Sequence, residues 1–156
     1  MATHVAETGA TYAENATLKA LAALRASELA AVGDDSGLEV EALGGFPGLH
    51  SARVGHDPAT RIKLVLEKLE RKPKPWRARF VCELAVAVPD GRVRTFRGET
   101  EGEIVTPRGR AGFGYDPIFL VSEAGRTFAE MSEQEKNEYS HRGRAVRRWL
   151  ESGWVS

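Results

Sequence analysis

The pattern of apolar and polar positions first becomes regular at residues 12–29, and the regularity is helical. This segment is rich in strong helix formers, and Thr11 and Glu14 form a capping box at its start. An apolar stripe recurs at helical spacing and is expected to face the core. The stripe consists of Leu18, Leu21, Ala22 and Leu29. Asn15 and Lys19 lie four residues apart and therefore share another flank of the same helix.

Two further helices are predicted downstream. One begins at Asp57, a favourable N-cap, with Pro58 at its first helical position, and the Lys-Pro repeat at residues 72–75 ends it. The other is basic and closes the chain. Its segment opens with a capping box formed by Ser132 and Glu135, and the last helix starts at Ser140.

The strand-like segments lie between these helices. Residues 29–32 and 38–43 have the composition of strands on either side of an acidic turn. Residues 77–88 and 92–98 flank Pro-Asp-Gly, which is a hairpin signal. Residues 102–107 suggest one more strand, and a glycine-rich loop leads into another. With little room for repeated strand–helix–strand units, we expect an α/β fold in which helices flank a mixed central β-sheet.

The composition is that of one soluble globular domain, covering residues 1–156 without a linker or repeat. The chain is 42% hydrophobic and 28% charged, with a formal net charge of zero. A neutral surface does not attract nucleic acid or an anionic membrane, and no apolar run approaches the roughly 20 residues of a membrane span. The single Cys82 and the lack of a signal-peptide pattern at the start favour a cytoplasmic protein.

The stretch AVGDDSGLEV raises a chemical question, because two adjacent carboxylates repel each other. Asp34 and Asp35 could simply cap a turn. Alternatively, one of them could hold Mg²⁺ and a water molecule, since hard cations prefer carboxylate and phosphate oxygens. Successive residues of a strand point to opposite faces, so only one of the two can face a given cleft.

Three other segments allow either a structural or a chemical interpretation. Lys19 is a solvated helix residue or a partner of phosphate groups. The loop GFGYDP is a turn or a backbone that approaches a ligand, with Phe113 or Tyr115 stacking on a ring. Ser140 is an N-cap followed by surface residues, or the first residue of a donor cluster for a base carbonyl. The histidines have no zinc-ligand spacing with Cys82, and neither a Walker nor a dinucleotide-binding motif occurs.

Taken together, four motifs resemble the inosine triphosphate pyrophosphatase family over nearly the whole chain. They are ETGATYAENATLKA, DDSGLEVEALGGFPGLHSAR, GFGYDPIF and EKNEYSHRG. The resemblance implies hydrolysis of ITP, dITP and XTP to the monophosphate and pyrophosphate, with Mg²⁺ as cofactor, in a homodimer. It also implies that the family's opening strand and triphosphate-binding loop are absent here, so a nucleotide-binding remnant with impaired catalysis is the alternative.

The resemblance also implies roles for individual residues. Glu7 and Asp35 match the magnesium-binding acids, and Asp35 also matches the proton acceptor for the attacking water. Lys19 and Ser36 match contacts to the triphosphate, while Asp34 is expected to support the turn. The base pocket and the residues that grip the base match Phe113, Gly114, Tyr115, Asp116, Lys136, His141 and Arg142. A third hypothesis, nucleic-acid binding by the basic run HRGRAVRR, is disfavoured by the zero net charge.

Overall fold

The computed structural model describes residues 8–154. The helices are α1 (Tyr12–Ser27), α2 (Pro58–Leu69), α3 (Glu133–Tyr139) and α4 (His141–Ser152). The strands are β1 (Ala31–Val40), β2 (Trp76–Ala87), β3 (Val93–Ile104), β4 (Phe119–Val121) and β5 (Arg126–Thr127). Short 3₁₀ turns occupy Glu41–Leu43, Gly48–His50, Asp116–Ile118 and Phe128–Glu130. None of the described helices combines the length and the apolar character needed to cross a membrane.

The predicted α/β fold, with helices flanking a central sheet, is confirmed. The described strands pair in the order β1-β2-β3-β4-β5, and each pairing is antiparallel, where a mixed sheet was expected. Each strand follows its neighbour without a parallel crossover, which explains the difference. The hairpin between β2 and β3 lies where Pro-Asp-Gly predicted it. Residues 102–104 extend β3 and do not form a separate strand.

β1 corrects the interpretation of the acidic pair. The segment from Ala31 to Val40 is one continuous strand, not two strands around a turn. Asp34 and Asp35 therefore lie in the middle of a strand and point to opposite faces of the sheet. The expectation that Asp34 supports a turn is wrong, because no turn exists at this position.

α1 packs on β1 through a different face from the one expected. Its buried apolar residues are Tyr12, Ala16, Ala20 and Leu24, which recur every four residues. Leu29 is 67% exposed and lies beyond the helix, so the predicted stripe is not the core face. The small alanines bring the helix backbone close to the strand. A Cβ added to Gly33 would lie 2.5 Å from backbone atoms of α1, and only glycine fits there.

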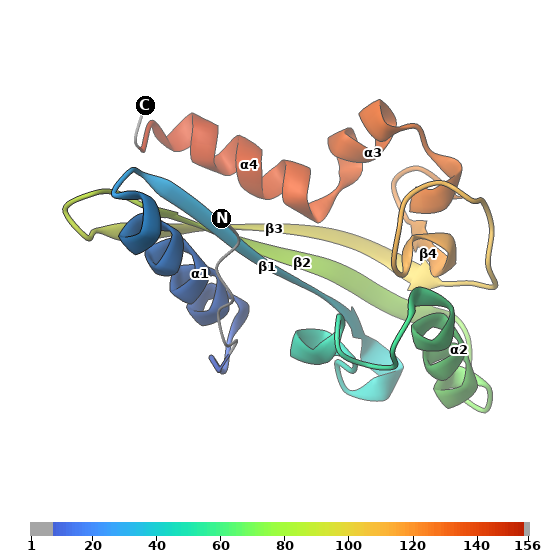
Figure 1. Cartoon of the computed structure of the whole chain (residues 1–156). Coiled ribbons are helices and arrows are strands. Elements are labelled where there is room, and N and C mark those ends of the chain that lie inside the picture. Colours follow the sequence, from blue (N-terminus) through green and yellow to red (C-terminus); the bar gives the residue numbers. More distant parts are fainter. Residues whose placement is uncertain (1–7, 155–156) are drawn as a thin grey trace.

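Figure 1 shows α1 and α4 on opposite faces of the sheet. Alternate residues of β2 explain this arrangement, because Ala85 and Ala87 pack with α1 whereas Cys82, Leu84 and Val86 pack with α4. Cys82 is fully buried, as is common for a free cysteine that packs as a small hydrophobic residue. Burial raises the pKa of its thiol to about 11, so we assign it no chemistry.

The C-terminal segment forms two helices, and both begin at a predicted cap, Ser132 for α3 and Ser140 for α4. Ser140 ends α3 and at the same time caps α4, because its hydroxyl accepts a hydrogen bond from the Gly143 N–H at 3.0 Å. The interpretation of Ser140 as an N-cap is thereby confirmed. The break at Ser140 directs the first residues of α4 toward the sheet, where His141 stacks on Phe80 of β2.

Candidate functional site

On the α1 side of β1, the Asp35 carboxylate is held by two residues of the helix. Lys19 Nζ lies 3.7 Å from Asp35 Oδ1 and donates to the Asp34 carbonyl oxygen at 3.0 Å. Asn15 Nδ2 donates to Asp35 Oδ2 at 3.2 Å. Asp35 is 8% exposed. The Lys19 ammonium is suited to bind polyphosphate, because phosphate oxygens are negatively charged and accept hydrogen bonds.

The α4 side of the same strand carries the other predicted groups. Arg142 NH2 lies 3.7 Å from Asp34 Oδ2, and most of the arginine side chain is exposed. Ser36, two residues along β1, lies on the same side and pairs with Cys82 of β2. β1 therefore links an α1-side group (Asn15, Lys19 and Asp35) to an α4-side group (Asp34 and Arg142).

Asp116 organises the glycine-rich loop. It is 4% exposed and accepts hydrogen bonds from Lys136 Nζ at 2.6 Å and from the Phe113 N–H at 3.0 Å. The same Lys136 ammonium lies 4.3 Å from the centroid of the Phe113 ring. Gly114 follows with a positive φ of 59°. This loop and Lys136 of α3 thus form a second assembly of donors and aromatic rings.

The two aromatic candidates of the loop differ in accessibility. Phe113 is 78% exposed, whereas Tyr115 is 6% exposed. The Tyr115 hydroxyl donates to the Ser51 carbonyl oxygen at 2.7 Å and fastens the loop to residues 48–51. Of the two rings, Phe113 is therefore the one available to stack on a ligand.

His141 is a largely buried imidazole between a ring and two cations. Its ring centroid lies 4.7 Å from that of Phe80, with nearly parallel planes. Burial lowers the pKa of His141 to about 3, and the nearby Lys136 and Arg142 act in the same direction. Within the described part of the chain, its Nδ1 is a buried polar atom without a hydrogen-bond partner. Leaving such an atom unpaired is unfavourable, and a ligand or an ordered water could supply the missing bond.

A stability prediction follows from this pKa. Because the unfolded histidine takes up a proton near its ordinary pKa of 6.5 and the folded one only near 3, the unfolded state binds more protons between these values. Stability should therefore fall as the pH drops below about 6.5, by at most about 1.4 kcal/mol per pH unit. Thermal unfolding between pH 7 and 5 measures this slope. The slope should decrease in His141→Gln, and an unchanged slope would contradict the assigned protonation state.

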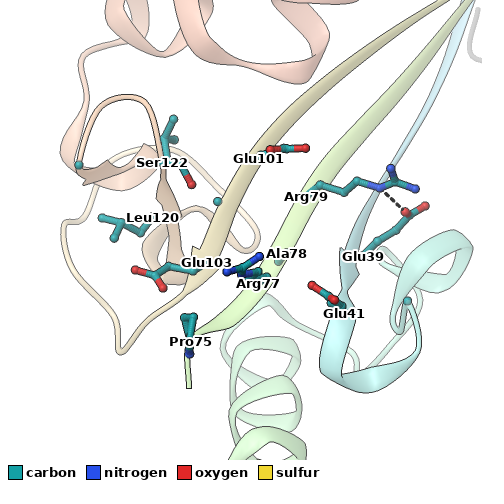
Figure 2. Close-up of a pocket in the computed structure, with 14 residues that line it drawn as sticks. Glu39, Glu41, Pro75, Arg77, Ala78, Arg79, Glu101, Glu103, Leu120 and Ser122 are labelled. Carbon is teal, nitrogen blue, oxygen red and sulfur yellow. Dashed lines mark hydrogen bonds and ion pairs between the residues drawn. The ribbon is translucent and has the colours of Figure 1, made fainter. Parts of the chain in front are cut away.

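A hollow of about 810 Å³ lies elsewhere on the sheet, over β2 and β3 (Figure 2). Its charged lining residues are Glu39, Glu41, Arg77, Arg79, Glu101 and Glu103. Arg79 Nε donates to Glu39 Oε1 at 2.7 Å. Four carboxylates against two guanidinium groups are unfavourable for a triphosphate, and none of the predicted site residues lines this hollow.

Three further sequence features remain to be placed: Glu7, possible clusters of metal ligands and the basic run of the last helix. Glu7 lies outside the described residues. Among residues 8–154, no cluster of three or more histidine, cysteine or acidic side chains could hold a metal ion. The basic run in α4 is engaged internally: Arg144 bonds the Glu99 carbonyl oxygen and Glu123, and Arg147 bonds carbonyl oxygens at the end of α3.

Sequence reasoning missed two contacts. It placed Asn15 on the same flank as Lys19 but assigned it no role, although the four-residue spacing predicts that both reach the same partner. It also missed the proximity of Arg142 and Asp34, because residues 108 positions apart meet only through the packing of α4 on the sheet.

Together, the fold and these groups describe an α/β protein with a cationic side chain on each side of one acidic strand. Comparison with known proteins is consistent with that description. The Ham1 family model matches residues 1–152, and the chain belongs to this family.

Similar proteins come from several bacteria. The chain is 52% identical over 150 residues to the dITP/XTP pyrophosphatase of Thermus thermophilus, with 94% of this chain and 72% of the relative covered. It is also 52% identical to the dITP/XTP pyrophosphatase of Gloeobacter violaceus, with coverage of 94% and 75%. The solved Ham1 protein of Staphylococcus aureus superposes with a TM-score of 0.88 at 41% identity, with coverage of 96% and 81%.

Proposed function

We propose that this protein hydrolyses deaminated purine nucleoside triphosphates (ITP, dITP and XTP) to the monophosphate and pyrophosphate, and so removes them from the nucleotide pool. The family membership and the relatives named dITP/XTP pyrophosphatase support the reaction. The observation that carries the proposal is the Lys19 ammonium beside the buried Asp35 carboxylate on the α1 side of β1. Arg142 lies beside Asp34 on the other face of the strand.

The α1-side group suits the phosphate chemistry. Lys19 binds phosphate oxygens and offsets their charge. The hydroxyl contact proposed for Ser36 from the sequence lies on the other side of β1, with Asp34 and Arg142. Asp35 orients the attacking water so that it lies in line with the bond between the α and β phosphates. Asp35 also accepts the proton of this water. Glu7 is proposed as a second acid on the basis of the sequence.

Asp35 also suits Mg²⁺. This ion keeps several waters and is usually held by one or two carboxylates together with substrate phosphates. The described residues fit that mode better than a closed protein cage, because they contain a suitably placed carboxylate but no cluster of three or more acidic, histidine or cysteine ligands. When bound, the ion supplies charge neutralisation at the phosphates.

The α4-side group and the glycine-rich loop suit the base. A 6-keto purine presents an acceptor to Arg142 and Lys136, whereas adenine presents an amino donor at the same position. A donor left facing a donor is unfavourable in a desolvated site. Phe113 is exposed and available for stacking, while His141 contributes its buried ring nitrogen. Gly114 and Tyr115 shape the loop, and Asp116 fixes its position.

The reaction is tested by measuring pyrophosphate release from ITP, dITP, XTP and ATP, with and without Mg²⁺. We expect Mg²⁺-dependent release from the first three and much slower release from ATP. Tight binding of ITP by equilibrium dialysis without any release would contradict catalysis and match a nucleotide-binding remnant.

Two finer features remain predictions from the sequence. The homodimer is checked by the mass of the particle in solution, and the cytoplasmic location by fractionation of cells.

A further inference from the structure

Asn15 is a buried polar residue of α1 whose side-chain amide is hydrogen-bonded at both its nitrogen and its oxygen. Its side chain is 1% exposed. Nδ2 donates to Asp35 Oδ2 at 3.2 Å, and Oδ1 accepts from the Gly9 N–H at 2.8 Å. A buried amide is unfavourable unless its polar atoms are hydrogen-bonded. Both ends of this amide are bonded, and one of them contacts the carboxylate at the centre of the proposed chemistry.

We propose that Asn15 is a positioning residue, which fixes the orientation of the Asp35 carboxylate for the metal ion and the attacking water. The inference rests on the function proposed above, because that function assigns Asp35 its role. Asn15 itself need not touch the substrate. It acts by restricting which way the carboxylate can rotate.

The contacts around Asp35 support this role. Asn15 bonds Oδ2, whereas Lys19, one helical turn later, lies 3.7 Å from Oδ1. One helix therefore contacts both oxygens of the carboxylate. The helix cannot easily shift, because its backbone packs directly against Gly33 of β1. A carboxylate held at both oxygens by a closely packed helix has few alternative orientations.

The second hydrogen bond of Asn15 explains the glycine in the motif before α1. A Cβ added to Gly9 would lie 2.7 Å from Asn15 Oδ1. The next residues are fixed to the first turn as well, since the Ala10 N–H donates to Glu14 Oε2 at 2.7 Å and Thr11 accepts from the Glu14 N–H. Asn15 thus joins the segment before the helix to Asp35, and a change at either end should disturb the carboxylate.

A purely structural asparagine would behave differently from a positioning one. Loss of a structural hydrogen bond lowers stability but leaves kcat of the folded protein unchanged. Loss of positioning lowers kcat at saturating substrate while KM changes much less, and it also weakens Mg²⁺ binding in the absence of nucleotide.

The main test is Asn15→Leu, which keeps the approximate size of the side chain and removes both hydrogen bonds. We expect kcat for ITP to fall about 10- to 100-fold, and the affinity for Mg²⁺ alone, measured by calorimetry, to fall about 10-fold or more. Asp57→Ala is the matched control. It removes the N-cap bond to Thr60 in α2, which lowers stability without changing kcat or Mg²⁺ affinity.

Gly9→Ala provides a second variant at a partly exposed position, in case Asn15→Leu does not fold. Crowding of Asn15 by the new methyl group should lower kcat and Mg²⁺ affinity in the same direction but less. If wild type releases pyrophosphate and folded Asn15→Leu and Gly9→Ala retain its kcat and Mg²⁺ affinity, the positioning role is wrong and the proposed function stands. If wild type releases none, the function fails, and the Mg²⁺ affinities alone decide the role of Asn15.

Discussion

Asp35→Asn should lower pyrophosphate release from ITP by about 10³-fold or more while the protein stays folded. The substitution removes one charge and the proton acceptor but keeps the size of the side chain. Asn15 and Lys19 contact the carboxylate, and an amide oxygen can still accept from one of them. Turnover at saturating ITP and Mg²⁺, together with thermal unfolding, measures both effects.

The neighbouring residue supplies the control for this prediction. Asp34→Asn makes the same chemical change one position earlier, on the opposite face of β1. It should retain most of the turnover of ITP. If Asp34→Asn lost more rate than Asp35→Asn at equal stability, the proton acceptor would have been assigned to the wrong acid.

Arg142→Ala should lower kcat/KM for ITP far more than kcat/KM for ATP. A charge-assisted hydrogen bond to the keto oxygen contributes roughly 1.5–3 kcal/mol, which corresponds to about 10- to 100-fold in rate. ATP does not make this bond, so the ratio of the two constants should shrink by about that factor. The measurement is kcat/KM for both substrates in wild type and variant.

The contact with Asp34 sharpens the test of Arg142. At 3.7 Å and with the arginine mostly exposed, this ion pair contributes about 0–1 kcal/mol to stability at most. Its effect on substrate choice should accordingly be small, and Asp34→Asn should lower the ITP-to-ATP ratio less than Arg142→Ala does. Equal losses on ITP and ATP in Arg142→Ala would mean that the arginine binds phosphate or supports the fold.

Local signals predicted the elements of the fold well but not their packing. Asp57 caps α2 and the hairpin lies at Pro-Asp-Gly, because both depend on residues close in sequence. The predicted core face of α1 was wrong, because the prediction was based on the leucines and did not consider Ala16 and Ala20 as core residues. Their small size matters only because the helix packs directly against Gly33 of the strand that follows it. Antiparallel pairing throughout the described sheet likewise depends on contacts between segments.

The site shows the same division. The motifs drew attention to Asp35, Lys19 and Asp116, and the structure shows how the first two meet. They could not show that Asp116 holds Lys136 and Phe113 together, because loop conformation decides those bonds. The prediction of a turn at the acidic pair was wrong. It followed from the general preference of acidic residues, serine and glycine for turns, whereas here they lie within the continuous strand β1.

The two faces of β1 limit how this stretch can change in evolution. Asp34 and Asp35 point to opposite faces of the sheet because they are consecutive residues of one strand. One inserted residue between Asp34 and Asp35 would place both carboxylates on the same side of the sheet or force a bulge in the strand. Either outcome would remove the partner of Lys19 or that of Arg142. Natural variants of this strand should therefore differ by substitution and keep a constant length, which a collection of Ham1-family sequences can test.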